Sequence, residues 1–315
     1  MVCLYGTHFM TRGSFQECTY TAKRFLIILQ SLTPLLRRGF LFLRTTIWYK
    51  VKTLKIVYLG DIVAKSGREA VKNAISQLKD TYKYDVIIIN VDNAAHGFGC
   101  TPKVCNQLFE AGVTALVTGD HVWNQKDIYP YLNECKRIVR PLNHSSNLAG
   151  VGAQIIPLDS GKKILIVEVV GRVFMEAVDC PLQSLENLLK DYHLGKNIDA
   201  IFVDIHAEAT AEKQSFAYYF DGKVSAVIGS HTHVPTADER ILPNGTAYQT
   251  DAGMCGDYNS VIGFDVKAPI ERLKDKFSPH RLEPATNKGT VCGVYIETDD
   301  KTGLAKYIER IKITL

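Results

Sequence analysis

The sequence lacks the common signals of export and membrane insertion. Its 8 cysteines include no C-x-x-C pair, and no secretory cleavage pattern is present. Scattered cysteines in a chain of 315 residues favour reduced thiols over a disulfide framework. No apolar run reaches the roughly 18 uninterrupted residues of a membrane span. We therefore expect a cytoplasmic protein without a membrane span.

The body of the chain also lacks an excess of basic residues. The chain has 37 basic and 33 acidic residues, of which residues 1–53 hold eight and one. The other 29 basic and 32 acidic side chains belong to residues 54–315, which are therefore slightly acidic. Because phosphate recognition on nucleic acids needs concentrated Lys and Arg, no stable nucleic-acid complex is expected.

Residues 1–53 are interpreted as a basic N-terminal extension. Their short apolar runs are interrupted by Arg37, Arg38 and Arg44. One interpretation is a targeting or membrane-surface segment. The other, which we favour, places the segment upstream of the native start, with Leu54 at a start codon. In both cases residues 54–315 form the functional domain.

Strand and helix patterns alternate from Leu54 onward. Several apolar runs are nearly continuous in Val, Ile and Leu, which is typical of strands buried on both faces. Apolar residues at helical spacing predict a helix within Gly67–Lys83, and Thr101-Pro102 has the cap and first residue of another. This alternation predicts a single α/β domain. The predicted strands are Leu54–Leu59, Val86–Val91, Thr114–Thr118, Ile164–Val170, Ala200–Ile205, Ala226–Ile228 and Thr290–Ile296.

Metal-ligand side chains follow five of these strands. A single Asp or His in such a place is usually a turn or loop residue. Their recurrence after five strands indicates one crevice, because open α/β sheets bind ligands at the carboxyl ends of their strands. The residues are Asp61, Asp92, Asn93, Asp120, His121, His206, His231 and His233.

This donor set has a chemical meaning. Carboxylate, amide oxygen and imidazole together suit divalent first-row metals, and we expect two ions, Fe or Mn ahead of Zn or Co. Two ions roughly 3.5–4 Å apart can clamp a phosphate and make hydroxide available near neutral pH. Asp92 is the candidate bridging carboxylate. His121 lies beside a candidate ligand, where it can protonate a leaving oxygen as general acid.

At these residues the sequence resembles the calcineurin-like metallophosphoesterases, and more narrowly their YmdB-type branch of 2′,3′-cyclic-nucleotide 2′-phosphodiesterases. The resemblance runs from about residue 54 to 312. It rests on ordered blocks that include Gly60-Asp61-Ile62-Val63, Asp92-Asn93-Ala94-Ala95-His96-Gly97, Gly119-Asp120-His121-Val122-Trp123, His206-Ala207-Glu208-Ala209-Thr210 and Gly229-Ser230-His231-Thr232-His233-Val234.

The resemblance implies a four-layer αββα sandwich of two mixed β-sheets flanked by helices. It also implies His121 as the proton donor. One metal would be held by Asp61, Asp92, Asn93 and His233, and the other by Asp92, Asp120, His206 and His231.

Two positions depart from the branch pattern. Asp92 stands where the branch usually has Glu, and Asp120 stands where it has Asn. A carboxylate at 92 should still bridge, whereas the added charge at 120 should alter metal preference or rate. Arg172 and His96 are further candidates, for contact with the substrate phosphate and for the substrate pocket.

The expected activity is hydrolysis of small phosphodiesters, in particular 2′,3′-cyclic nucleotides to 3′-nucleotides, by metal-bound hydroxide with a His general acid. A phosphatase or nuclease of broader range on the same site is one alternative. A regulatory, RNA-associated protein with secondary catalysis is another. The sequence leaves open whether the chain forms a homo-oligomer.

Overall fold

The structure, a computed structural model, describes residues 53–315. The predicted N-terminal extension lies outside this range, apart from Thr53. The strands are β1 (Lys55–Leu59), β2 (Val86–Asn90), β3 (Ala115–Val117), β4 (Ile138–Val139), β5 (Ala153–Pro157), β6 (Lys163–Val170), β7 (Ala200–His206), β8 (Ala226–Ser230), β9 (Arg240–Ile241), β10 (Ala247–Gln249), β11 (Thr290–Thr298) and β12 (Ala305–Thr314). The helices are α3 (Ala64–Tyr82), α4 (Pro102–Glu110), α5 (Ile128–Glu134), α6 (Pro181–Leu188), α7 (Thr210–Tyr219) and α8 (Lys267–Lys274).

In the described part of the chain, the strands form two six-stranded mixed sheets. The first has the order β12-β11-β1-β2-β3-β4, with β1 to β4 parallel and the two C-terminal strands antiparallel. The second has the order β5-β6-β7-β8-β10-β9, with β6, β7, β8 and β10 parallel. Parallel strands that share one direction bring their carboxyl ends to one edge of each sheet.

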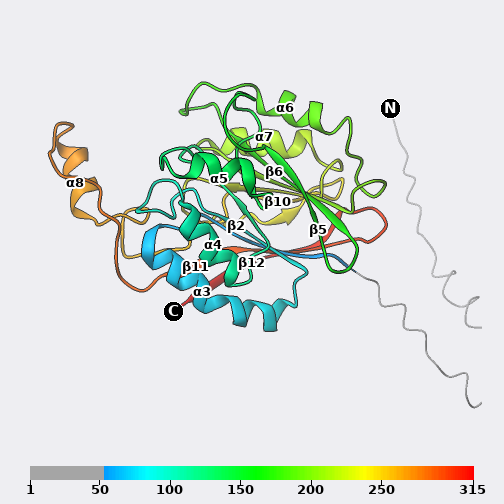
Figure 1. Ribbon diagram of the computed structural model, residues 1–315, viewed down its shortest axis with the longest axis horizontal. Coiled ribbons are helices and arrows are strands. Elements are labelled where there is room, and N and C mark those ends of the chain that lie inside the picture. The colour runs from blue at the N-terminus through cyan, green and yellow to red at the C-terminus, as the bar shows by residue number, and fades with distance from the viewer. Residues whose placement is uncertain (1–52) are drawn as a thin grey trace, which may run out of the picture. The chain divides into compact units, whose positions relative to one another are not determined.

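The two sheets stack face to face, and helices cover their outer faces (Figure 1). Alternate residues of β1 show this layering, because Val57 packs with α3 and α4 while Tyr58 packs between the sheets. Phe216 of α7 and Leu185 of α6 cover the outer face of the second sheet. Every residue of β2, β7 and β8 is buried, as expected for strands covered on both sides. The predicted four-layer α/β sandwich is confirmed.

The predicted helix boundaries are confirmed at one helix and differ at another. The hydroxyl of Thr101 accepts the backbone N–H of Val104, so Thr101 is the N-cap of α4 and Pro102 its first residue. Helix α3 starts at Ala64, three residues before the predicted Gly67. Within residues 53–315, no helix combines the length and apolar character needed to cross a membrane.

Candidate metal centre

The predicted ligands lie at the carboxyl ends of both sheets. Strands β1, β2 and β3 are parallel neighbours in the first sheet, as are β7 and β8 in the second. Chain turns after these strands therefore meet at one edge of the sandwich. Asp61 follows β1, Asp92 and Asn93 follow β2, Asp120 and His121 follow β3, His206 ends β7, and His231 and His233 follow β8.

One group of donors surrounds the buried ring of His206. Its Nε2 lies 2.9 Å from Oδ1 of Asp120, 3.1 Å from Nδ1 of His231 and 3.5 Å from Oδ2 of Asp92. Nδ1 of His231 is also 3.5 Å from the same Asp120 oxygen. Asp120, His206 and His231 offer ligand atoms within 4.8 Å of one another, so these two imidazoles and one carboxylate form a group that could hold a metal ion.

A second group of donors surrounds His233. Its Nε2 lies 3.2 Å from Oδ1 of Asn93 and 3.9 Å from Oδ1 of Asp61. Among the described residues this Asp61 oxygen is buried without a hydrogen-bond partner, although the other oxygen accepts the N–H of His231 at 3.1 Å. A buried carboxylate oxygen without a donor is costly, so the arrangement calls for a cation.

A chain of buried hydrogen bonds fixes the ring of His206. The hydroxyl of Ser230 donates its hydrogen to Asp204 at 2.6 Å, so the Ser230 oxygen accepts Nδ1–H of His206 at 2.9 Å. Asp204 also accepts from the hydroxyl of Tyr58 at 2.5 Å and from the amide of Asn90 at 3.0 Å. Because Nδ1 donates to Ser230, Nε2 is the nitrogen that faces the carboxylates and could bind a metal once its proton is lost.

The other two histidines are oriented in the same manner. The backbone oxygen of Ile262 can only accept, so at 2.7 Å it takes Nδ1–H of His233 and leaves Nε2 bare. The carboxylate of Glu208 lies 3.4 Å from Nε2 of His231, and the other ring nitrogen of His231, Nδ1, faces Asp120. Each imidazole therefore turns one nitrogen outward to a hydrogen-bond acceptor and the other toward the acidic groups, which is the outer-shell pattern of metal-binding histidines.

The backbone around these side chains is unusual. His231 and His233 have φ of 89° and 66°, in the left-handed region that non-glycine residues seldom occupy. Such strain persists where the surrounding structure demands it, commonly at binding sites. Gly119 is required for a different reason: a Cβ there would lie 2.4 Å from Nε2 of His206, so only glycine leaves room for the ring.

The charges of the centre are strongly coupled. Burial alone would lower the pKa of His206, but the Asp120 hydrogen bond and nearby carboxylates raise this pKa to about 10. Burial, together with the charges of Asp120 and Asp61, raises the pKa of Asp92 to about 7 against the effect of His206. Burial would raise the pKa of Asp120, yet hydrogen bonds from His206 and His231 lower it. Without a metal, protons take the place of cations in this site, so the donor set fits divalent metal ions.

His121 lies at the rim of the centre. Its Nε2 is 3.9 Å from Oδ2 of Asp120, and its backbone N–H donates to both oxygens of Asp92 at 3.1 Å. The amide nitrogen of Asn124 lies 3.3 Å from Nδ1, and the ring of Phe98 packs edge-on against the imidazole. Burial lowers the pKa of His121, while the Asp120 charge opposes this shift.

Arg172 and His96 make no hydrogen bond or ion pair with these groups in residues 53–315. Arg172 is exposed after β6, and Gly171 of the same loop donates its N–H to the carbonyl of His206. His96 is exposed, with φ of 52°, three residues beyond Asn93. Neither side chain is drawn into the cluster.

Sequence reasoning missed the residues that orient the histidines. Asp204 and Glu208 flank His206 at a spacing of two, and Ser230 directly precedes His231. Period-two alternation along β7 places Asp204 and His206 on one face of the strand, which could have indicated Asp204. The backbone oxygen of Ile262 has no side-chain signal that a sequence could reveal.

The fold and this centre define a class: a two-sheet α/β sandwich with clustered carboxylate and imidazole donors at its strand ends, as in the metallophosphoesterases. Residues 57–311 match the family described as YmdB-like protein. The chain belongs to this family.

Individual relatives agree with that assignment. The chain is 41% identical over 260 residues to the 2′,3′-cyclic-nucleotide 2′-phosphodiesterase of Bacillus subtilis (strain 168), which covers 82% of this chain and 97% of the relative. A solved phosphatase from Mycoplasma pneumoniae superposes with a TM-score of 0.78 at 36% identity, over 84% of this chain and 94% of that one. A hypothetical protein from Thermus thermophilus gives 0.77 at 36% identity, over 83% and 99%.

Proposed function

We propose that the chain is a phosphoric diester hydrolase that opens 2′,3′-cyclic nucleotides to 3′-nucleotides at a centre of two metal ions. The observation that carries the proposal is the pair of donor groups around His206 and around His233. Asp92 lies 3.5 Å from His206, and the next residue, Asn93, lies 3.2 Å from His233. The name of the Bacillus relative supports the substrate class. Free thiols at the six cysteines of the described residues agree with a cytoplasmic location.

Seven side chains would hold the ions. Asp61, Asn93 and His233 would bind one, Asp120, His206 and His231 the other, and Asp92 would bridge them. When bound, the ions, which we expect to be Fe or Mn rather than Zn or Co, supply positive charge for the phosphate and a hydroxide nucleophile near neutral pH. The three oriented histidines keep the donor atoms in place without rearrangement.

His121 would act on the leaving group. Attack on phosphorus breaks the bond to the 2′ oxygen, which must gain a proton to leave as an alcohol. A protonated His121 at the rim of the centre would donate that proton. Its lowered pKa makes the imidazolium a strong acid but reduces the protonated fraction near pH 7. Arg172 and His96 are retained as candidate substrate contacts, on the phosphate and in the pocket respectively.

The first experiment uses the full-length chain loaded with Mn²⁺ or Fe²⁺. We expect turnover of 2′,3′-cyclic AMP to the 3′-nucleotide, with His121→Gln losing activity by about 10²–10⁴-fold, the usual contribution of general acid catalysis. Metal content, measured by elemental mass spectrometry, should stay at the wild-type level in this variant. Exclusive formation of the 2′-nucleotide, or full activity in His121→Gln, would contradict the assigned chemistry.

The same assay separates a broader activity. The Mycoplasma relative carries the name phosphatase, so bis(p-nitrophenyl) phosphate and p-nitrophenyl phosphate are tested beside the cyclic nucleotide. A cyclic phosphodiesterase should prefer 2′,3′-cyclic AMP in kcat/KM. Equal values on all three substrates would favour a general phosphoesterase on the same metal centre.

A further inference from the structure

A polar pocket of about 390 Å³, apart from the metal centre, lies between α3 and α4. Its charged lining consists of Lys65, Arg68, Lys72 and Lys103 with one carboxylate, Glu69. None of these residues belongs to the metal centre. Cationic side chains thus outnumber anionic ones in the pocket, whereas residues 54–315 as a whole are slightly acidic.

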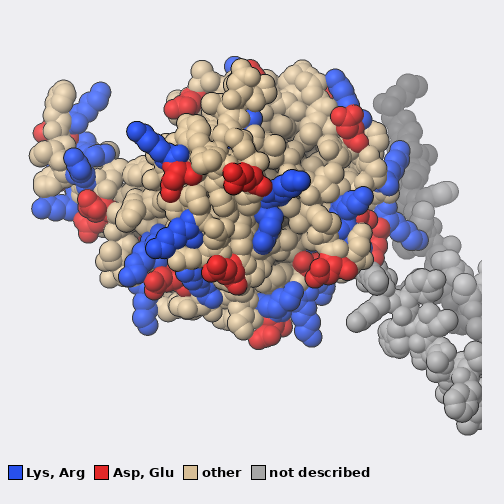
Figure 2. All heavy atoms as spheres, in the orientation of Figure 1, with Lys and Arg blue, Asp and Glu red and all other residues tan. Residues whose placement is uncertain are grey.

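The four cations have no anionic partner of their own. Within residues 53–315 none of them forms an ion pair with a carboxylate inside 4.0 Å. Arg68 is half-buried and donates from Nη1 to the carbonyl of Ala94. Figure 2 shows Lys and Arg side chains gathered over the first half of α3. Like charges held together repel, so their grouping favours an anionic ligand.

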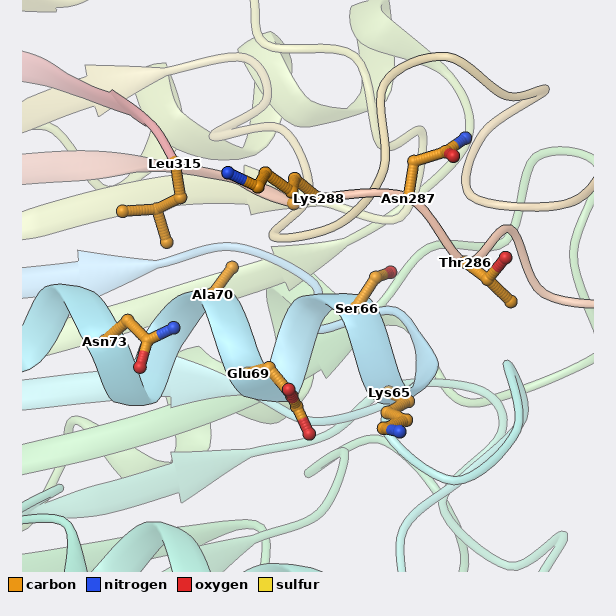
Figure 3. A pocket seen from close by; sticks show the side chains of 10 residues that line it. Lys65, Ser66, Glu69, Ala70, Asn73, Thr286, Asn287, Lys288 and Leu315 are labelled. Carbon is orange, nitrogen blue, oxygen red and sulfur yellow. The ribbon is translucent and has the colours of Figure 1, made fainter.

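Backbone features add to the positive field. Thr101, the N-cap of α4, lines the pocket together with Lys103 in the first turn. The start of this nine-residue helix carries partial positive charge, which favours anions. Figure 3 shows a neighbouring pocket along α3, which Lys65 and Glu69 also line, together with Lys288 and Asn287; these last two do not line the basic pocket. Lys288 therefore offers a control beside the same helix, outside the basic pocket.

One loop joins this pocket to the metal centre. Asn93 faces His233 in the centre, and Ala95 and His96, two and three residues later, line the basic pocket. Arg68 holds the intervening Ala94 carbonyl. A ligand in the pocket would therefore lie next to the loop that supplies a metal donor.

We propose that the pocket is a phosphate-binding site separate from the metal centre. A phosphate group has the charge and acceptor oxygens that Lys and Arg recognise. The volume, near the lower end for small-molecule sites, admits the phosphate with part of an attached nucleoside. Two sources share this chemistry: a free phosphate ion, and the second phosphate of a nucleotide chain whose terminus occupies the metal centre.

Equilibrium dialysis with ³²P-labelled inorganic phosphate tests the site in the metal-loaded full-length chain. Lys72→Glu/Lys103→Glu should weaken binding about tenfold at one site, in proportion to two lost exposed ion pairs, and leave any binding at the metal centre unchanged. Lys274→Glu/Lys288→Glu, which changes the net charge equally, should bind phosphate like the wild type. Urea unfolding of all three proteins checks that the variants are folded.

Two results overturn the proposal. Wild-type phosphate binding by Lys72→Glu/Lys103→Glu would show that the pocket is not a site. Equal loss in both double variants would assign the binding to the overall field of the protein.

Kinetics then separate the two sources, and this arm alone rests on the proposed function. If the pocket takes a second substrate phosphate, Lys72→Glu/Lys103→Glu raises KM about tenfold for a dinucleotide ending in a 2′,3′-cyclic phosphate. The KM for 2′,3′-cyclic AMP should then stay unchanged. Unchanged KM for both substrates, with phosphate binding lost in dialysis, assigns the site to a free ion. If neither substrate is turned over, the proposed function fails while the dialysis result stands.

Discussion

Gly119→Ala is a direct test of the ligand role of His206. The added methyl carbon would lie 2.4 Å from Nε2, 2.5 Å from Cε1 and 2.6 Å from Cδ2 of that ring. Nearly equal distances to three ring atoms mean that the methyl presses on the face of the imidazole. Nonbonded carbon contacts are about 3.5–4.0 Å, so the ring must move by roughly 1 Å.

That movement is large compared with what the centre tolerates. Nδ1 of His206 is 2.9 Å from Ser230, and Nε2 is 2.9 Å from Asp120, so a shift of this size disrupts both contacts. Metal–ligand distances vary by only about 0.2 Å. We expect metal affinity to fall about 100-fold, at the upper end of the effect of outer-shell changes. Overpacking should also cost about 1–3 kcal/mol in the free energy of unfolding of the metal-free protein.

The assay measures metal per chain after gel filtration, together with urea unfolding. Gly256→Ala is the matched control, because a Cβ there would lie 3.3 Å from Cβ of Val63, a contact that small movements can relieve. In Gly119→Ala/His206→Ala the clash is absent, so the stability costs of the two changes should be non-additive. Wild-type metal affinity in Gly119→Ala, with additive stability costs, would refute the assigned position of the ring.

Four further predictions concern charge. Metal binding near pH 8 should release protons, because in the metal-free protein His206 with a pKa of about 10 is protonated and Asp92 with a pKa of about 7 is protonated in a fraction of the molecules. Calorimetry in buffers of different ionisation enthalpy measures this release. A binding enthalpy that does not depend on the buffer would contradict the prediction. Both pKa values are raised, so these groups should make the metal-free protein lose stability as pH rises from about 4 to 10. Asp120→Asn removes a carboxylate that lies 3.9 Å from Nε2 of His121. Its attraction for the protonated imidazole is about 1 kcal/mol even in water, so its loss should lower the pKa of His121 and move the basic limb of the kcat profile down by about 0.7 pH unit. An upward shift would be incompatible with His121 as the acid. In the wild type, the buried ammonium of Lys213 lies 2.8 Å from the buried carboxylate of Asp251. Lys213→Met leaves that carboxylate without its cation and should lower the free energy of unfolding, measured in urea, by about 3–5 kcal/mol. A loss below about 1 kcal/mol would show that the pair is not isolated from water.

The buried strands were predictable because their sequences reflect burial on two faces. The runs that became β2 and β6 consist mostly of Val, Ile and Leu, and the run that became β7 adds Ala and Phe, so composition alone indicates them. The edge strand β12 is mixed, with exposed residues such as Lys306 and half-buried ones such as Ile308, and it was missed. The three-residue β10 was missed as well, since so short a strand has no periodicity and forms through its pairing with β8.

The candidate ligands were predictable for a related reason. Each stands directly after a recognisable strand, and parallel pairing brings such positions to one edge. What the sequence could not provide is the second layer of contacts. The oxygen of Ile262 reaches His233 across 29 positions of chain, and the ring of His206 rests over Gly119 from the other sheet. Both depend on how the two sheets stack, which no local pattern encodes.

Asp120 gains a specific meaning from this geometry. It is the nearest carboxylate to His206, at 2.9 Å, and it also contacts His231 and faces His121. With Asp61 and Asp92, three carboxylates would offset three of the four charges of two divalent ions, whereas Asn at 120 would leave only two to do so. The site with Asp would therefore bind its metals more tightly and attract the anionic phosphate less. Asp120→Asn should accordingly lower the metal affinity and also lower the KM for the phosphodiester. A variant that binds its metals more tightly and also has a lower KM would contradict this electrostatic account.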